Sequence, residues 1–450
     1  MVDRDVVVIG GGLAGISAAL RVADGGATVT LLEGRPRLGG AAFSFRRGVL
    51  SVDNGQHVFL RCCEAYRWLL ERLGVTDRTV LQARLDIPVL APDRRRAHLR
   101  RTPGVPAPGH LTAALATYRL LSPLDRVRAV RGAVALRLLD PADPALDEQT
   151  LGAFLRRHGQ SHAVIDALWG IVATATLNLP PDEASLALAA KVFRTGLLDH
   201  APAADIGYAA SSLGELHSDA ARVALAAAGV EVLVAHRVEN VADGPVVRAH
   251  GRGGAREFRP DAVIVAVPPR ELFRVAPMLL VGPVAPAQRL GTAPIVNVHV
   301  VYDRTVTDLP FAAALDSPVQ WFFDRTDASG LRATHPRGQY LAVTVSAADA
   351  IVDTPSKALC EQFVDALGRL LPAAGRAEVL DAFVTRERHA TFRQAPGTAA
   401  LRPGSASGVD GVLLAGAWTA TGWPDTMESA VRSGLAAAGA ATGAAAGAAA

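Results

Sequence analysis

The start of the chain places a glycine-rich turn between a buried strand and a helix. Residues 5–9 (DVVVI) are a short apolar run typical of a fully buried strand, and the motif GGGLAG at residues 10–15 follows directly. An apolar helical pattern over residues 16–23 is stopped by two glycines, and a second strand over residues 28–32 ends on Glu33. This order indicates an α/β fold whose first strand–turn–helix unit binds a dinucleotide.

Each glycine of the turn has its own steric reason. Gly10 allows the tight exit from the strand, Gly12 lets the backbone approach a pyrophosphate, and Gly15 lets the helix pack on the strand. Glu33 lies 23 residues beyond Gly10, where a carboxylate can accept hydrogen bonds from ribose hydroxyls and disfavours a 2′-phosphate. We therefore do not expect NADP here. The alternative is a glycine-rich turn that binds no ligand.

A second glycine motif follows the acidic residue. The segment EGRPRLGG at residues 33–40 resembles the extended fingerprint of FAD enzymes in the amine oxidase and phytoene desaturase superfamily. In that superfamily an arginine and a glycine pair run alongside the cofactor, and the matching positions are Arg37, Gly39 and Gly40. An NAD dehydrogenase has no need of this second glycine pair, so we expect the cofactor to be FAD.

The resemblance also implies how the chain is organised. It implies an α/β fold with a Rossmann-type FAD-binding domain split in sequence, and an inserted α+β substrate domain with a sheet floor and a helical cap. The length of 450 residues is sufficient for two or three domains. The expected FAD-binding segments are 1–85, 205–290 and 396–450, the last with a C-terminal helix and tail, and the substrate segments are 86–204 (helical, membrane contact) and 291–395 (β-sheet).

Apolar runs bounded by turn residues predict the remaining strands. A strand pair over 231–241 and single strands over 261–267 and 411–416 are expected to return to the FAD-binding sheet, and a final helix is expected from about residue 426. The strands expected in the substrate domain are 295–302, 319–323 and 340–346.

Two further motifs narrow the resemblance. DNGQH at residues 53–57 and GAWTATGWPDTMESAVRSG at residues 416–434 closely resemble the hydroxysqualene dehydroxylases, flavoenzymes of bacterial squalene and hopanoid (isoprenoid lipid) synthesis. The resemblance implies that reduced FAD converts hydroxysqualene to squalene in an apolar tunnel. Three alternatives stay open: a carotenoid-type desaturase acting on phytoene or dehydrosqualene, an amine or porphyrinogen oxidase, and a non-enzymatic protein with structural FAD.

Loss of hydroxide from an allylic carbon needs a proton donor, and three residues are candidates. His57 lies in a turn that the resemblance places close to the isoalloxazine, although it could instead only hydrogen-bond flavin or backbone. Asp425 also has the sequence context of a helix N-cap, and Glu428 opens the last helix, where it could simply cap that helix or favour its dipole. Asp53 is expected to fix its own turn.

The motifs also supply a set of expected FAD contacts and one departure from the superfamily. The superfamily usually has Gly-Asp after the last strand, whereas this chain has Gly416-Ala417, which removes one polar partner of FAD. Trp418 is expected in the core, and Trp423 could line the flavin or the substrate. The expected cofactor contacts are Gly10, Gly12, Leu13, Ala14, Gly15, Glu33, Gly34, Arg35, Arg37, Gly39, Gly40, Ala41, Gln56, His57, Val238, Gly416, Trp423 and Met427.

Positive charge is concentrated in one part of the chain. Residues 94–137 contain ten arginines and one acid, Asp125, mixed with leucine and valine at helical spacing. This pattern suits peripheral contact with an anionic membrane, from which a C30 hydrocarbon could be drawn, although a solvated helix face is the alternative. A nucleic-acid partner is not expected, because stacking aromatic residues and a known module are missing.

The remaining expectations concern compartment and metal. Three cysteines, no signal peptide and no apolar run long enough to span a bilayer favour a cytoplasmic protein on the inner face of the cell membrane, without a disulfide framework or a metal site. The sequence does not identify the reductant that supplies electrons to FAD.

Overall fold

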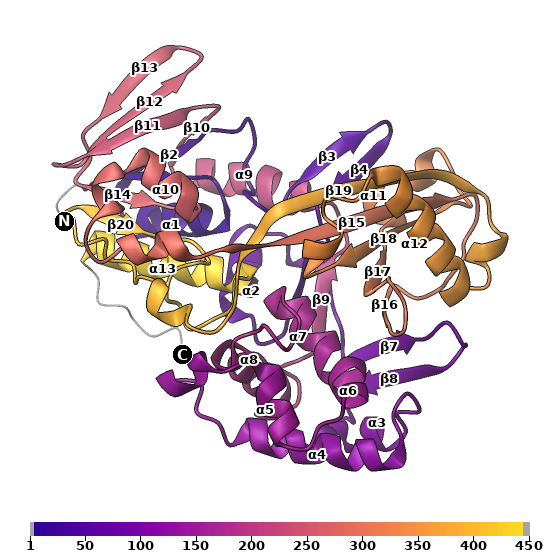
Figure 1. The fold of residues 1–450 in the computed structure, drawn as a ribbon. Helices are drawn as coiled ribbons and strands as arrows, with labels where there is room; N and C mark the ends of the chain where they lie inside the picture. Colours follow the sequence, from indigo (N-terminus) through magenta and orange to yellow (C-terminus); the bar gives the residue numbers. More distant parts are fainter. Residues whose placement is uncertain (1–3, 444–450) are drawn as a thin grey trace.

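The computed structural model describes residues 4–443, and its first strand lies in the middle of a five-stranded parallel sheet (Figure 1). The strands of this sheet come from widely separated parts of the chain and include all three returning segments that the sequence predicts. Their order across the sheet is β10 (Glu231–Val234), β2 (Thr28–Glu33), β1 (Asp5–Ile9), β14 (Ala262–Val265) and β20 (Val412–Leu414). A parallel sheet of this kind is buried on both faces, which explains the continuous apolar runs of its strands.

Helix α1 (Leu13–Asp24) and helix α13 (Met427–Thr442) pack against each other beside this sheet (Figure 1). Their contact is close because Gly434 has no side chain: a Cβ there would lie 2.2 Å from Ala14 O and 2.2 Å from Ser17 Oγ. Ser17 is fully buried and donates to Ala14 O at 3.0 Å. The N-terminal glycine turn and the C-terminal motif are therefore held together by direct helix packing.

The expectation that residues 231–241 enter the parallel sheet as a strand pair is wrong for the second strand. Ala235, which has a φ of 54°, turns the chain away after β10. The following strand β11 (Arg237–Ala242) pairs instead with β12 (Val246–Gly251), which pairs with β13 (Gly254–Phe258), all antiparallel. Two strand-like runs in sequence do not reveal which sheet each one joins.

A second, seven-stranded mixed sheet forms the other large body of the molecule (Figure 1). The strands predicted at 295–302, 319–323 and 340–346 are confirmed as β15, β17 and β18, whereas β16 and the long β19 were not foreseen. The order is β19 (Val379–Phe392), β15 (Thr292–Tyr302), β18 (Gln339–Val345), β17 (Trp321–Asp324), β16 (Phe311–Ala314), β7 (Asp86–Leu90) and β8 (Arg96–Arg100).

Alternation along β15 assigns its two faces. Val296, Val298 and Val300 are fully buried in a cluster that includes residues of helix α12 (Ser356–Leu370). Asn297 and His299 point to the opposite face, and they are also fully buried. The sheet thus presents polar side chains on the face that does not carry α12.

The segment that follows β8 is mainly helical and lies below the two sheets in Figure 1. Residues 86–204 were expected to form the helical part of the substrate region, but this range opens with β7 and β8, which extend the seven-stranded sheet. Its helices are α3 (Thr112–Ala116), α4 (Pro123–Arg137), α5 (Leu151–Arg157), α6 (His162–Val164), α7 (Gly170–Leu177) and α8 (Leu186–Phe193). Among residues 4–443, none of the helices combines the length and the apolar character that crossing a bilayer requires.

Smaller elements connect these bodies. A hairpin of β3 (Ser44–Arg47) and β4 (Leu50–Asp53) leads into the DNGQH motif, and a three-stranded sheet follows it. The other elements are β5 (Val58–Leu60), β6 (Thr79–Leu81), β9 (Ile206–Ala209), α2 (Glu64–Arg72), α9 (Ala220–Ala227), α10 (Pro269–Val275) and α11 (Thr326–Ser329).

Candidate cofactor and active site

The glycine turn between β1 and α1 has no room for side chains. A Cβ on Gly10, whose φ is 106°, would lie 2.4 Å from Ala266 O, and a Cβ on Gly15 would lie 1.8 Å from Gly10 O. Gly12 is the N-cap of α1 and supplies no capping side chain, so the first N–H groups of this helix are available to an external acceptor. A helix N-terminus of this kind attracts a phosphate anion.

Glu33 lies at the end of β2 with its carboxylate at the turn. Its Oε2 accepts a hydrogen bond of 2.7 Å from Gly11 N–H, and its Oε1 accepts one of 2.7 Å from Arg35 N–H. The side chain is therefore held beside the glycine turn at the place where a ribose bound to that turn would lie.

The second glycine motif folds back onto the first. Gly39 N–H donates to Gly11 O at 2.8 Å, and a Cβ on Gly40 would lie 2.7 Å from Gly12 Cα. The guanidinium of Arg37 lies 3.5 Å from the centre of the Phe43 ring, and burial lowers the pKa of Arg37 to about 10. The two backbone segments form a cradle that a side chain would fill, and an uncapped helix points into it, which fits the pyrophosphate of FAD.

Five more of the expected cofactor contacts adjoin the two glycine segments in sequence, and two lie on other elements. Leu13 and Ala14 begin α1, and Gly34, Arg35 and Ala41 lie in the loop after β2. Val238 lies in β11 of the antiparallel sheet. It follows Arg237, whose Cα would lie 3.8 Å from a Cβ on Gly34. Met427 is the first residue of α13.

His217 supports this cradle and was not identified from the sequence. It lies in a π-helical turn before α9, and its Cβ would be 3.4 Å from a Cβ on Gly39. Its Nδ1 lies 3.3 Å from Ala42 O and its Nε2 lies 2.8 Å from the Tyr66 hydroxyl. Burial lowers the pKa of His217 to about 4, so the ring is neutral, with Nδ1–H donating to Ala42 and Nε2 accepting from Tyr66. Nothing in the sequence around His217 signals this role.

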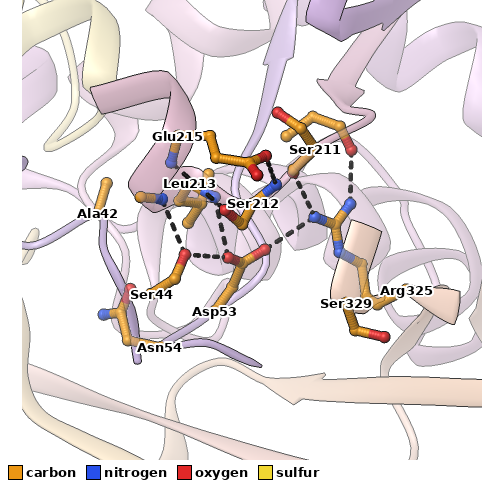
Figure 2. A network of polar contacts seen from close by, with 12 residues as sticks. Ala42, Ser44, Asp53, Asn54, Ser211, Ser212, Leu213, Glu215, Arg325 and Ser329 are labelled. Carbon is orange, nitrogen blue, oxygen red and sulfur yellow. Dashed lines mark hydrogen bonds and ion pairs between the residues drawn. The ribbon is translucent and has the colours of Figure 1, made fainter. Parts of the chain in front are cut away.

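Asp53 does not fix its own turn, as the sequence suggested, but connects three separate elements (Figure 2). Its Oδ1 accepts from Ser44 Oγ at 2.6 Å and from Leu213 N–H at 2.9 Å, and its Oδ2 accepts from Arg325 at 2.8 Å. Arg325 also donates to the backbone oxygens of Ala209 and Ser211. The pair is almost fully buried, so the start of the DNGQH motif is anchored to β9 and to the end of β17.

The GQH turn carries the groups closest to the polar face of β15. A Cβ on Gly55 would lie 3.5 Å from Asn297 Nδ2 and 3.7 Å from His57 Nε2, and Asn297 donates to Asn54 O at 3.0 Å. Gln56 has a buried Nε2 without a hydrogen-bond partner among the described residues, as expected of a side chain that contacts a ligand. Burial lowers the pKa of His57, and the charge of Asp53 opposes that shift only in part.

Arg402 organises the C-terminal motif loop and was also missed. Its guanidinium donates to the backbone oxygens of Ala417, Trp418, Thr419 and Trp423 at 2.5–3.2 Å. Four carbonyl groups from one loop converge on this single buried cation. The shape of the loop is therefore set by a residue outside the motif.

Gly416 and Trp423 are the two expected cofactor contacts in the loop of this motif, and they differ in how free they are to bind a ligand. Gly416 N–H donates to Ser433 Oγ at 2.8 Å, so this amide already has an acceptor within the protein. Trp418 is buried as predicted, with its Nε1 donating to Val267 O at 3.0 Å. Trp423 is half-buried and lies between two cations, with Lys191 Nζ 4.8 Å and the Arg432 guanidinium 5.0 Å from its ring centre.

Asp425 is a carboxyl group whose acidity is perturbed by burial. Its Oδ2 accepts from Phe392 N–H at 2.7 Å. Burial raises the pKa of Asp425 to about 6, although this hydrogen bond and the charge of Arg402 oppose the shift. The expectation that Asp425 is the N-cap of the last helix is wrong, because Thr426 holds that position and its hydroxyl accepts from Ser429 N–H.

Glu428 is fully buried and uses both carboxylate oxygens within the protein. They accept from Ala65 N–H at 3.2 Å and from Tyr66 N–H at 2.8 Å, and Arg432 donates to the same carboxylate at 2.6 Å. Glu428 therefore caps the N-terminus of α2 rather than that of its own helix. Both oxygens of this carboxylate are thus engaged in holding α2 and Arg432.

Both sequence motifs contact strand β19. Asn54 of the first motif donates to Glu387 at 3.0 Å, and Asp425 of the second accepts from Phe392 on the same strand. Five residues of extended chain separate these two contacts, or about 17 Å at 3.4 Å per residue. The DNGQH motif and Asp425 thus contact the same strand at two points about 17 Å apart.

Comparison with known proteins gives a consistent result. The family model for flavin-containing amine oxidoreductases matches residues 13–442. Over 454 residues the chain is 30% identical to the hydroxysqualene dehydroxylase of Rhodopseudomonas palustris (97% of this chain, 98% of the relative), and over 445 residues it is 29% identical to that of Sinorhizobium fredii (97% of both). A redesigned putrescine oxidase has a similar fold, with a TM-score of 0.71 and 18% identity over 97% of this chain and 98% of that one.

Proposed function

Because the chain belongs to the family of flavin-containing amine oxidoreductases, we propose that it removes the hydroxyl group of hydroxysqualene reductively and releases squalene. The protein is an FAD-dependent oxidoreductase. The observation that carries the finer proposal is the similarity to hydroxysqualene dehydroxylases over 97% of the chain.

The pKa directions distinguish the candidate proton donors. Burial lowers the pKa of His57, so its imidazole is neutral near pH 7 and holds no acidic proton. Burial raises the pKa of Asp425 to about 6, so about one tenth of this carboxyl group is protonated at pH 7 and about half at pH 6. Glu428 is occupied as a helix cap. Asp425 is therefore assigned as the acid, and His57 as a neutral hydrogen-bonding group of the cofactor site.

The reaction balances with these groups. The allylic C–O bond breaks, the hydroxyl group takes the proton of Asp425 and leaves as water, and a C–H bond forms at the same carbon. FAD, when bound and reduced, supplies the hydride for that C–H bond. Arg402 fixes the loop that carries Asp425, and the Asp53–Arg325 pair fixes the turn that carries His57. A second proton later restores Asp425.

The hydrocarbon nature of the proposed substrate also indicates where in the cell the protein would act. Hydroxysqualene partitions into lipid, so the proposal includes a cytoplasmic protein in peripheral contact with the inner face of the cell membrane.

Purified protein with bound FAD, reduced anaerobically by dithionite and mixed with hydroxysqualene, should yield squalene in amounts equal to the flavin oxidised. Product analysis by gas chromatography and the flavin absorbance near its oxidised maximum give two independent readouts. Flavin that stays reduced, with no squalene formed, would reject the proposal.

The same preparation distinguishes the alternatives. Oxidised protein incubated with phytoene or dehydrosqualene would form additional conjugated double bonds if the chain were a carotenoid-type desaturase. Flavin that can be neither reduced nor reoxidised at a useful rate would instead support a structural FAD in a non-enzymatic protein.

A further inference from the structure

Helix α4 carries a stripe of exposed apolar side chains on its outer side. The exposed fractions are 59% for Leu124, 68% for Val127, 50% for Val130, 51% for Val134 and 80% for Leu138. Spacings of three and four residues place these five side chains on one face of the helix. Exposed large apolar residues normally occur singly, so a continuous row of five indicates a contact surface.

The opposite face of α4 already supplies the core contacts of this helix. Ala129, Gly132 and Leu136 are buried there. The packing is close, because a Cβ on Gly132 would lie 2.8 Å from Gln160 Cδ. One alternative was that the apolar residues of this segment only pack the core. This interpretation is correct for Leu136, whereas the side chains of the outer stripe are exposed.

Arginines surround the stripe, and some have no acidic partner. Arg119 and Arg131 are exposed and form no ion pair with any acid in residues 4–443. Arg137 lies 3.8 Å from Asp199 at the other end of the helix. The one acid of the helix, Asp125, is turned inward and bonded to Ser122, Ser161 and Arg128. The outer side of α4 thus combines the apolar stripe with the exposed cation of Arg131, and Arg119 lies just before the start of the helix.

We propose that this face of α4 docks on an anionic lipid bilayer, with the apolar stripe at the boundary of headgroups and acyl chains and the arginines on lipid phosphates. Charge complementarity selects this occupant, because an anionic surface neutralises Arg119 and Arg131, whereas a second copy of the chain would bring two cationic faces together. In Figure 1, α4 runs along the outer edge of the helical segment, at the end of the molecule away from the parallel sheet, so docking leaves the nucleotide cradle free.

The inference rests on the proposed function in one respect only: a substrate that partitions into lipid gives the protein a reason to bind a membrane. The test of the inference needs no substrate. The FAD-loaded protein is sedimented with vesicles of phosphatidylcholine alone and of phosphatidylcholine with phosphatidylglycerol. The wild type should bind the anionic vesicles, and less so at high salt because the arginine contacts are screened.

The double variant Val127→Glu/Val134→Glu should bind about 100-fold more weakly, since each buried valine contributes about a factor of ten. The double variant Arg119→Gln/Arg131→Gln should lose roughly 30-fold, from about fivefold per arginine. Val223→Glu is the matched control, because Val223 is 72% exposed on α9, away from α4, and should bind as the wild type does.

Bound flavin and the melting temperature confirm that each variant is folded; if the double glutamate variant loses flavin, Val127→Gln alone replaces it. Wild-type protein that ignores anionic vesicles, or a Val223→Glu variant that loses binding equally, would overturn the proposal. Light scattering that finds a dimer abolished by Val127→Glu/Val134→Glu would assign the stripe to a second copy instead, and would likewise overturn it. None of these outcomes depends on whether hydroxysqualene is the substrate.

Discussion

Replacing Asp425 by asparagine removes the proposed acid while keeping its structural contact. Asparagine retains an oxygen that can accept from Phe392 N–H, so the end of β19 stays bound. General acid catalysis typically contributes about 10²–10⁴ in rate, and kcat for squalene formation should fall by that factor. In the wild type, kcat/KM should be highest below about pH 6, where Asp425 is protonated, and should fall about tenfold per pH unit above it.

The same variant has a stability signature that does not depend on turnover. The pKa of Asp425 is raised from 3.8 to about 6 on folding, so its contribution to stability is complete below pH 3.8 and is lost as pH rises through about 6. At 1.36 kcal/mol per pH unit, the wild type loses at most about 3 kcal/mol across this window, and Asp425→Asn should not. Urea unfolding of both proteins at pH 4 and pH 8 measures the difference.

A variant with wild-type kcat/KM and the same pH profile would refute the assignment of Asp425 as proton donor. A variant that is inactive but whose stability changes with pH as in the wild type would refute the perturbed pKa. Turnover and unfolding therefore test separate parts of the reasoning.

Three further predictions concern the scaffold of the site. Gly15→Ala should abolish FAD retention after gel filtration, because its Cβ would lie 1.8 Å from Gly10 O; full flavin content would contradict this. Asp53→Ala should lower the free energy of unfolding by about 3–5 kcal/mol, because it leaves Arg325 buried without its carboxylate. Adding Arg325→Met to the Asp53→Ala chain should recover part of that loss, which a double-mutant cycle measures. Glu428→Gln should destabilise by about 1–3 kcal/mol while squalene formation persists in the folded fraction; loss of turnover at unchanged stability would restore Glu428 as a catalytic candidate.

The nucleotide-binding unit could be predicted from the sequence because its requirements are local. Gly15 is needed by a steric contact within one strand–turn–helix unit, where its Cβ would lie 1.8 Å from Gly10 O, and Glu33 follows at a distance set by the length of that unit. Apolar runs likewise revealed strands such as β14 and β20, since a strand buried on both faces must be apolar throughout. They did not reveal that β11 leaves the parallel sheet, because both sheets accept the same kind of run.

The roles of the acidic residues were decided only by the tertiary structure. Asp53, Asp425 and Glu428 are all carboxylates in recognisable motifs, yet one is held by Arg325, one has a pKa raised by burial, and one caps α2. Each role depends on partners that are hundreds of residues away or on solvent exclusion by packed elements. The sequence determined that the first 40 residues can hold a dinucleotide, because backbone sterics and spacing are local properties, and the resemblance of residues 33–40 to the FAD fingerprint pointed to FAD. Packing determined which carboxyl group keeps a proton, because desolvation and charge pairing exist only in the folded chain.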